Sequence, residues 1–309
     1  MIDAVPFFFA LGVLARLAKS ELKLPVAVFD ALSIYLLLAI GLKGGVQLAA
    51  NSNPDLPLHA LMAVGLGALI PLLAFPLLRL RFNRFDAASL AAHFGSISIV
   101  TFAVASSYLT SLGLEYEGHL ALLAALMEAP AIVVATILAR TGGGERPAWS
   151  KLAHEVLANK SVLLLLGGIV IGWIAGPGGT EALKPLFGDL FKGALCLFLL
   201  EMGLVAAARL GDLKRAGLFL VLCGIGLPLG NAALGWLAAT VMGLSLGGTV
   251  LFMTLAASAS YIAAPTAMRL AVPEANPALG IAAALALTFP FNVLLGIPLY
   301  LHAARILAG

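Results

Sequence analysis

The stretches Phe94-Gly95-Ser96-Ile97-Ser98 and Ala257-Ser258-Ala259-Ser260-Tyr261 each interrupt a long apolar run, and Pro265 follows the second one closely. Glycine, clustered serines and proline favour a local break in a helix. The two stretches therefore predict broken helices within residues 86–111 and 246–270. Because the backbone groups that a break frees need polar partners, each break is expected to line a protected cavity.

The composition indicates that these helices lie in a membrane. Hydrophobic residues make up 61% of the 309 positions and charged residues only 11%, against about a quarter charged in a soluble domain. The net charge is +3, but the sequence has no basic stripe that would contact phosphates, which excludes a nucleic-acid partner. Cys196 and Cys223 lie in apolar runs and form no disulfide or metal-ligand pattern, and no cofactor is expected.

Ten apolar runs predict ten transmembrane helices, so the fold class is an all-α membrane protein. The start Met1-Ile2-Asp3 lacks the basic residues of a signal peptide, so the short first run is counted as a span. The polar residues 141–160 are predicted to be a cytoplasmic linker between two halves, residues 1–140 and 161–309. The runs cover residues 4–17, 25–48, 57–79, 86–111, 118–140, 161–176, 188–208, 214–242, 246–270 and 277–303.

The distribution of lysine and arginine predicts the orientation of these spans. With both termini outside, only Lys43, Lys184, Lys192 and Arg305 of the 18 basic residues lie on or near the outer side. The excess on the other side agrees with the known bias of basic residues toward the cytoplasm. The basic residues assigned to the inner side are Arg16, Lys19, Lys23, Arg79, Arg81, Arg84, Arg140, Arg146, Lys151, Lys160, Arg209, Lys214, Arg215 and Arg269.

The two halves resemble each other at an offset of about 162 residues. Leu37-Leu38-x-x-Gly41-Leu42 aligns with Leu199-Leu200-x-x-Gly203-Leu204, and Ser96-Ile97-Ser98 aligns with Ser258-Ala259-Ser260. Five spans per half is an odd number, so the second half would enter the membrane in the opposite direction. Inverted repeats occur in many secondary transporters, whose binding sites lie near the midplane between the repeats. The broken fourth and ninth helices are therefore expected to cross there.

The chemistry of two crossed breaks suits an anion and a cation. The half-helix after each break starts with free N–H groups and a positive dipole end, which favour an anion. The half-helix before each break ends in free carbonyls, which suit a small cation. The alternative is that small residues only let the helices pack closely, but two clusters at repeat-related positions favour a binding site. The predicted substrate-binding residues are Gly95, Ser96, Ile97, Ser98, Ser258, Ala259, Ser260 and Tyr261.

Charged residues inside spans are costly and mark a site or a pair. Glu128, Lys43 and Glu201 lie within predicted spans, and Thr288 matches Glu128 in the repeat, since each precedes a proline by two positions. These four residues are the candidates for coupling transport to an ion. Lys43 is expected to pair with Glu201 or Glu128, or else to extend to the outer surface.

The ordered motifs resemble those of the sodium-dependent bicarbonate transporter family, the single-component permease type found in cyanobacteria and many other bacteria. The similarity covers nearly the whole chain. It rests on Ile40-Gly41-Leu42-Lys43-Gly44-Gly45, Phe94-Gly95-Ser96-Ile97-Ser98, Met127-Glu128-Ala129-Pro130, Ser258-Ala259-Ser260 and Pro273-Glu274-Ala275-Asn276-Pro277.

The resemblance implies a fold and a function. It implies ten spans in inverted five-helix repeats, a homotrimer in the bacterial inner membrane, and uptake of bicarbonate driven by sodium, with substrate at the two breaks. A lysine ammonium at Lys43 could take the place of a bound cation, so protons remain an alternative coupling ion. Cyanobacterial members associate with a PII-like regulatory protein, but residues 141–160 offer little surface for that partner.

The expected function is secondary active transport of a small anion, bicarbonate first, by alternating access. The alternatives are a carrier of a carboxylate or bile-acid-like organic anion, a channel, and a membrane-embedded enzyme. An enzyme is not expected, because the sequence lacks a zinc motif, an aspartate pair within the spans and a glycine-flanked serine.

Overall fold

The computed structural model describes residues 4–51, 53–141 and 149–307. Helix accounts for 83% of the structure, and those ranges contain no strand. The helices are α1 (Val5–Leu17), α2 (Val26–Ala50), α3 (Leu56–Leu78), α4 (Arg84–Gly95), α5 (Ile99–Ser111), α6 (Leu120–Arg140), α7 (Trp149–Leu157), α8 (Lys160–Thr180), η1 (Glu181–Leu183), η2 (Pro185–Asp189), α9 (Phe191–Ala208), α10 (Leu210–Val241), α11 (Leu246–Ala257), α12 (Ala263–Ala271), α13 (Pro277–Ala282), η3 (Ala283–Thr288), α14 (Phe289–Phe291), η4 (Asn292–Gly296) and α15 (Ile297–Leu307).

Eight helical segments are long and apolar enough to cross a membrane. One of them, Arg84–Ser111, joins α4 and α5 across their break, and another, Pro277–Leu307, joins α13 through α15. The shorter apolar helices α1 and α11 fall below that length. Large apolar side chains such as Leu14, Ile174 and Val241 are exposed, which is typical of a surface that contacts lipid. The chain is therefore a multi-pass membrane protein.

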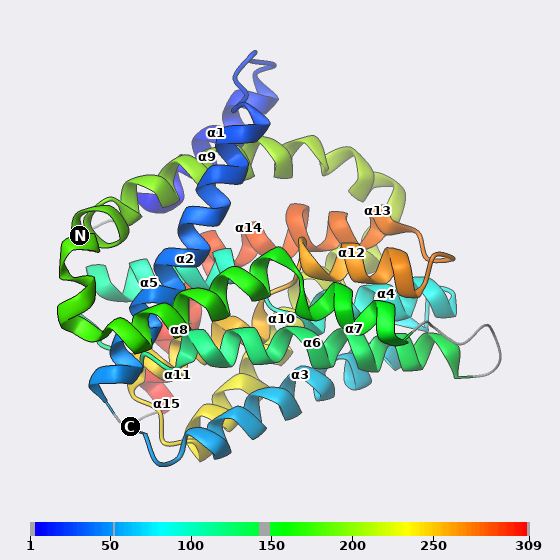
Figure 1. The fold of residues 1–309 in the computed structure, drawn as a ribbon. Coiled ribbons are helices and arrows are strands. Elements are labelled where there is room, and N and C mark those ends of the chain that lie inside the picture. Colours follow the sequence, from blue (N-terminus) through cyan, green and yellow to red (C-terminus); the bar gives the residue numbers. More distant parts are fainter. Residues whose placement is uncertain (1–3, 52, 142–148, 308–309) are drawn as a thin grey trace.

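Four helices form a part that we call the panel: α1, α2, α8 and α9. In it α2 packs along α8, and α1 packs along α9. Glycines permit these close approaches, because a side chain on Gly41 or Gly45 would collide with the α8 backbone, and one on Gly203 with the α1 backbone. Figure 1 shows the start of α2 projecting beyond the other helices, with α9 passing close to α1.

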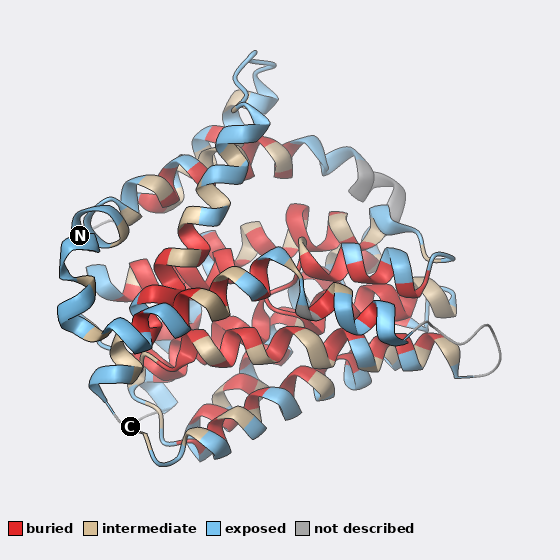
Figure 2. Ribbon diagram, viewed as in Figure 1, coloured by how far each residue is buried: buried red, intermediate tan, exposed pale blue. Residues whose placement is uncertain are grey.

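The remaining transmembrane helices, α3–α6 and α10–α15, form a part that we call the core. Figure 2 shows buried residues concentrated in its central layer and exposed residues on the outlying turns of α2 and α9. The two parts differ in how far their helices are buried. In the most apolar stretch of α4–α5 every residue is buried, whereas in that of α2 only 33% of the residues are buried. The α4–α5 segment is therefore enclosed by protein, and the panel offers much of its surface to lipid.

Two helices of the core are interrupted at the quoted stretches. α4 ends at Gly95 and α5 begins at Ile99, and Ser96 and Ser98 have extended backbone angles. α11 ends at Ala257, where Ser258 is extended, and α12 begins only at Ala263. A polar side chain also fixes the start of each interrupted helix: the Asn83 oxygen accepts from Asp86 N, and the Ser245 hydroxyl oxygen from Gly248 N.

Two carboxylates connect these helix starts to the opposite half of the chain. Glu117, which precedes α6, accepts from Ser245 N at the start of α11 (2.6 Å). Asp86, in the first turn of α4, accepts from Asn276 N at the start of α13 (2.7 Å). Each bond also places negative charge at a helix N-terminus, where the helix dipole favours it.

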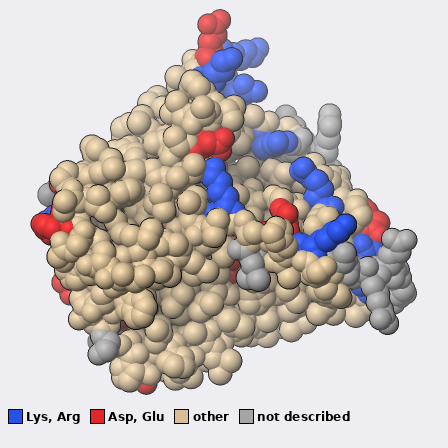
Figure 3. Space-filling model, viewed as in Figure 1, with Lys and Arg blue, Asp and Glu red and all other residues tan. Residues whose placement is uncertain are grey.

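Residues 141–160 contain the amphipathic helix α7, which packs against α12 and α8. The predicted linker residues Gly142–Gly144, Glu145 and Arg146 lie outside the described part of the chain, as do the side chains of Lys214 and Arg215. Figure 3 shows basic side chains gathered at the top and right of the molecule, with a broad uncharged area over the rest of this face.

Candidate functional site

The two interruptions lie side by side and are joined by hydrogen bonds. Ser98 N donates to Ser258 Oγ (2.8 Å), which connects the start of α5 to the end of α11. Ser260 N donates to the His93 carbonyl (2.8 Å), and His93 Nδ1 lies 2.6 Å from the Ser260 carbonyl oxygen. Backbone that would otherwise lack partners in a membrane interior is thus satisfied by the opposite interruption.

Asparagines from neighbouring helices satisfy carbonyls at the ends of the two half-helices. Asn292 Nδ2 donates to the Ala257 carbonyl at the end of α11 (2.9 Å), and Tyr300 in turn donates to Asn292 Oδ1 (2.7 Å). Asn231 Nδ2 lies 3.5 Å from the Phe94 carbonyl near the end of α4. Both asparagines therefore bond between helices.

We call the place where the two interruptions meet the crossing. The half-helices α5 and α12 both begin beside it. Ser98 Oγ accepts from Thr101 N (3.3 Å), and Ser260 Oγ accepts from Ala264 N (3.1 Å). The first turn of a helix has four N–H groups without intrahelical partners, so one serine per helix does not satisfy all of them. The crossing therefore presents partial positive charge from two directions, which suits an anion.

Several buried polar atoms around the crossing have no hydrogen-bond partner among the described residues: Ser96 Oγ, Thr101 Oγ1, Tyr261 Oη and His93 Nε2. The Tyr261 hydroxyl lies near Ser98 but without a well-formed hydrogen bond. An unsatisfied buried polar group costs about 1–3 kcal/mol. The hydroxyls of Ser96, Thr101 and Tyr261 leave polar capacity at the two adjacent interruptions that a ligand or water could use, whereas His93 Nε2 lies against Gly280 of α13.

A cavity of about 10 Å³ lies at the crossing. This is about the space needed for one water molecule. The Glu128 side chain from α6, only 4% exposed, lines the cavity together with the start of α8. The lining residues are Ile97, Ser98, Ile99, Val100, Glu128, Ser161, Ser260, Tyr261 and Ile262.

The model of the Na+-dependent bicarbonate transporter superfamily matches residues 5–305. The chain belongs to this superfamily. The resemblance drawn from the motifs is thereby confirmed, and the match includes both interruptions and all the helices that surround them. Membership of a family of transporters indicates a transport function rather than catalysis. A search of curated proteins finds no match to this chain.

Three of the four residues that the sequence suggested for ion coupling do not line the cavity at the crossing. Lys43 is exposed and donates to the Tyr116 hydroxyl (2.8 Å). Glu201 accepts from Leu24 N (3.1 Å), and Thr288 donates to a carbonyl of α10 (2.9 Å). The expected pairing of Lys43 with Glu201 or Glu128 is therefore wrong. Lys43 instead bonds to Tyr116 at an exposed position.

The remaining predicted substrate residues are buried at the crossing without lining its cavity. A side chain on Gly95 would collide with Pro71 and Ala131, so this glycine is needed for packing. Ser96, Ser258 and Ala259 are at most 3% exposed, and Ser258 is committed to the bond with Ser98. The unpaired Ser96 hydroxyl is the one among them that remains available to a ligand.

Two polar residues at the crossing, Thr101 and Ser161, were not predicted from the sequence, nor were the apolar lining residues Ile99, Val100 and Ile262. Thr101, whose hydroxyl is unpaired, stands three positions after Ser98, and its place in the first turn of a half-helix could have identified it. Ser161 begins α8 and reaches the cavity through packing between α8 and α6. Only the three-dimensional arrangement identifies this second residue, because Ser161 borders the predicted linker in sequence.

Proposed function

We propose that this protein is a secondary active transporter that takes up a small anion, bicarbonate, by alternating access and couples it to sodium or protons. The observation that carries the proposal is the crossing itself. Unpaired buried hydroxyls of Ser96 and Thr101, the starts of α5 and α12, and the Glu128 carboxyl all lie around it. Anion-attracting groups and a carboxyl at one enclosed place suit joint binding of an anion and a cation.

The contacts of the two halves support an inverted repeat of five spans each. In the panel, Gly12 on α1 lies against Gly203 on α9, and Gly168 on α8 lies against Gly41 on α2. Gly41 and Gly203 are related by the sequence offset of 162, so each half supplies one partner to each contact. The carboxylate bonds at the starts of α4 and α11 exchange partners between the halves in the same way.

This symmetry supports counting α1 and the pair α11–α12 as spans, which gives ten. In the proposed arrangement the interrupted helices cross at the midplane of a bacterial inner membrane and both termini lie outside. The residues 1–140 and 161–309 are then the two repeats, and residues 141–160 the cytoplasmic connection. We further propose a homotrimer, as the motif resemblance implies.

The size of the crossing cavity favours a small anion over an organic one. At about 10 Å³ it has room for one water molecule and would open only slightly for an anion with one carbon. A bile-acid-like substrate would require the breaks to separate widely. The hydrogen bonds between Ser98 and Ser258 and between Ser260 and His93 oppose such a separation.

The coupling ion is proposed to interact with Glu128, the carboxyl that lines the cavity. Sodium would also need oxygen ligands from hydroxyls and from the carbonyls near the half-helix ends. A proton would need only the carboxyl itself. Glu128 is the one acidic residue in the lining of this cavity, so further cation ligands within that lining would be neutral oxygens.

Alternating access is proposed to move the core against the panel. Two contacts support this. The first turn of α8, in the panel, lies beside the crossing through Ser161, while the C-terminal third of α2 contacts the loop after α5 through Lys43 and Tyr116. The panel thus touches the core both at the crossing and at a core loop. Movement of one part along the other would change both contacts.

Uptake of labelled bicarbonate into proteoliposomes tests the proposal. We expect uptake that saturates with substrate and rises when an inward sodium or proton gradient is imposed. Absence of uptake under both gradients, together with transport of an organic acid, would overturn the substrate. Conduction that does not saturate would instead indicate a channel.

A further inference from the structure

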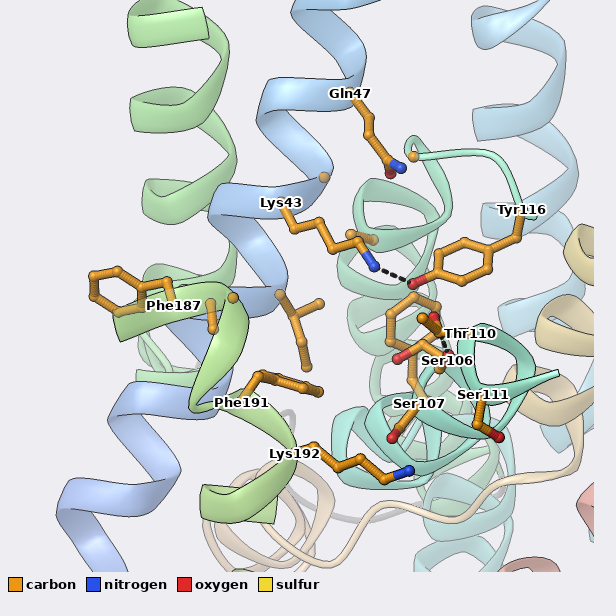
Figure 4. A pocket seen from close by; sticks show the side chains of 17 residues that line it. Lys43, Gln47, Ser106, Ser107, Thr110, Ser111, Tyr116, Phe187, Phe191 and Lys192 are labelled. Carbon is orange, nitrogen blue, oxygen red and sulfur yellow. Dashed lines mark hydrogen bonds between the residues drawn. The ribbon is translucent and has the colours of Figure 1, made fainter. Parts of the chain in front are cut away.

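A second, larger cavity lies between the panel and the core and shares no lining residue with the cavity at the crossing. Its volume is about 310 Å³, and Figure 4 shows it from close by. On the panel side, α2, the start of α9 and the helix η2 that connects α8 to α9 line the cavity. On the core side, α5 and the segment before α6 line it. The lining includes Ala39, Ile40, Lys43, Gln47, Phe102, Ser106, Ser107, Thr110, Ser111, Tyr116, Phe187, Gly188, Phe191 and Lys192.

The charged side chains in the lining of this cavity are of one sign, and the nearest glutamates belong to the adjoining hollows. Lys43 and Lys192 both line the cavity. All of its lining residues are described in the structure, and none of them is aspartate or glutamate. In Figure 4 both lysine side chains extend from the panel toward the hydroxyl residues of α5. Lys43 bonds to the neutral Tyr116 hydroxyl, so its positive charge attracts an anion to a lining that contains no carboxylate.

Donors for an anion are present beside the ammonium groups. The Tyr116 hydroxyl accepts a hydrogen bond from Lys43 Nζ (2.8 Å), so its own proton remains available to a ligand. The Ser107 hydroxyl makes no hydrogen bond to the described residues and is 8% exposed. Ser106, Thr110 and Ser111 instead donate to backbone carbonyls of α5. Lys43, Tyr116 and Ser107 are therefore the expected contacts of the anionic group.

The other wall of the cavity is apolar. Ile40, Phe102, Phe187 and Phe191 supply aliphatic and aromatic surface to it. Drug-sized ligands occupy cavities of roughly 300–1,000 Å³ that combine such a wall with a few polar groups. At about 310 Å³ this cavity is roughly thirty times the size of the one at the crossing, which has room for one water molecule. Bicarbonate, with one carbon, would leave most of this space and all of the apolar wall unused.

We propose that this cavity binds an amphipathic organic carboxylate that is not itself transported. The carboxylate contacts Lys43, Tyr116 and Ser107, and the apolar body packs on the phenylalanines of the panel. A molecule in this position touches both parts at once. Under the proposed movement of core against panel it would hold them in one arrangement and inhibit transport. The inhibition rests on the proposed function, whereas the binding itself does not.

Binding of 2-naphthoate and of its uncharged analogue 2-naphthamide tests the site. The full chain is placed in nanodiscs of neutral phosphatidylcholine, and binding is measured by calorimetry. We expect the carboxylate to bind at least about tenfold more tightly than the amide, because charge-assisted hydrogen bonds are the stronger ones. Lys43→Gln should remove most of that difference. Equal affinity of the two probes, or an unchanged preference in Lys43→Gln, would overturn the proposal.

Two further variants separate this cavity from its surroundings. Gly188 lines it, and a Cβ there would meet only the Lys184 side chain, at ordinary contact distance (3.4 Å). Gly188→Trp should therefore fill the cavity and abolish binding without removing a charge. Lys184→Gln, which removes a lysine from the same segment but not from this lining, should bind 2-naphthoate as the wild type does. Binding that survives Gly188→Trp, or is lost in Lys184→Gln, would contradict the assignment.

Nanodiscs containing anionic phosphatidylglycerol distinguish a free carboxylate from a lipid headgroup. We expect the affinity for 2-naphthoate to stay within about twofold, because the ligand must also fill the apolar wall. Loss of binding there would assign the cavity to the lipid and overturn the proposal.

In proteoliposomes the bound probe should lower the maximal rate of bicarbonate uptake without raising KM. Competition with bicarbonate, or uptake of labelled naphthoate, would make the probe a ligand of the crossing instead. If bicarbonate is not transported at all, the proposed function fails while the binding results stand.

Discussion

The Ser258 hydroxyl connects the two interruptions directly, so its removal should destabilise the protein. In Ser258→Ala the Ser98 N–H is left buried without this partner, which costs about 1–3 kcal/mol. We expect a lower midpoint of thermal unfolding in detergent. Ser96 is equally buried, but its hydroxyl is unpaired.

Ser96→Ala is therefore the matched control for stability and a test of substrate binding. It should unfold at the wild-type temperature or slightly above, yet bind bicarbonate more weakly. Ser260→Ala should also weaken binding, since Ser260 lines the crossing cavity. Unchanged affinity in both variants would remove these hydroxyls from the site and leave a site made of backbone groups.

Glu128 carries the prediction for coupling. Glu128→Gln keeps the size of the side chain but removes its charge, so uptake should no longer respond to the imposed ion gradient. Glu201→Gln is the control, because Glu201 bonds to Leu24 N away from the cavity and glutamine can still accept that bond. Gradient-dependent uptake that persists in Glu128→Gln would assign coupling to another group.

A pair of histidines near the start of α6 predicts a pH dependence of stability. His119 Nε2 lies 2.8 Å from His59 Nδ1, and burial, together with the nearby His59, lowers the pKa of His119 from 6.5 to about 4. As the pH falls below about 6.5, the unfolded chain binds a proton before the folded chain does, so folding stability is lost between pH 6.5 and 4.

Thermal unfolding measured across this pH range checks the prediction. His119→Gln should flatten the decline, whereas replacement of the exposed His302 should leave it unchanged. An identical decline in wild type and His119→Gln would show that another group controls it.

At the scale of single residues, helix ends follow local signals: α4 ends at Gly95 and α11 at Ala257, both within the serine-containing stretches quoted from the sequence. The location of Lys43 and Glu201 depended on which neighbouring helix each one faces. Hydropathy does not contain that information, and both residues bond to partners distant in sequence, Tyr116 and Leu24.

At the scale of elements, the packing of α2 on α8 depends on glycines. A Cβ on Gly168 would lie about 3 Å from backbone atoms of α2, whereas one on the adjacent Gly167 would meet nothing within 4 Å. Gly168→Leu should therefore destabilise the panel by about 1–3 kcal/mol or more, the cost of overpacking. Gly167→Leu should be close to wild type in thermal unfolding. Equal effects of the two would show that helix propensity, not packing, matters here.

The predicted spans agree with most helices within a few residues, because each long apolar run specifies its own helix. Residues 181–189 differ: they contain the short helices η1 and η2, where the sequence predicted a connection over residues 177–187. The carboxylate bonds of Glu117 and Asp86 were also not predicted. They join segments more than 100 residues apart, and no local pattern indicates such a pairing.

At the scale of the whole molecule, the division into panel and core emerges only from contacts between helices. The repeat offset of 162 indicates which helices are equivalent but not which ones pack together. In the structure α1 packs on α9 and α2 on α8, so each panel contact combines the two halves of the chain. A panel built in this way can remain rigid while the core moves, and this property leads to the last prediction.

A cross-link between panel and core should arrest transport, whereas one within the panel should not. Lys43 and Tyr116 are in hydrogen-bond contact across the boundary, and Lys160 and Asp30 form an ion pair (3.2 Å) between two panel helices. The native cysteines are both buried. A short thiol cross-linker applied to Lys43→Cys/Tyr116→Cys should abolish bicarbonate uptake, and a reducible linker should restore it on reduction. The same treatment of Lys160→Cys/Asp30→Cys should leave uptake unchanged. Because both pairs are accessible and close, full uptake in the cross-linked Lys43→Cys/Tyr116→Cys protein would mean that panel and core do not move apart there during transport.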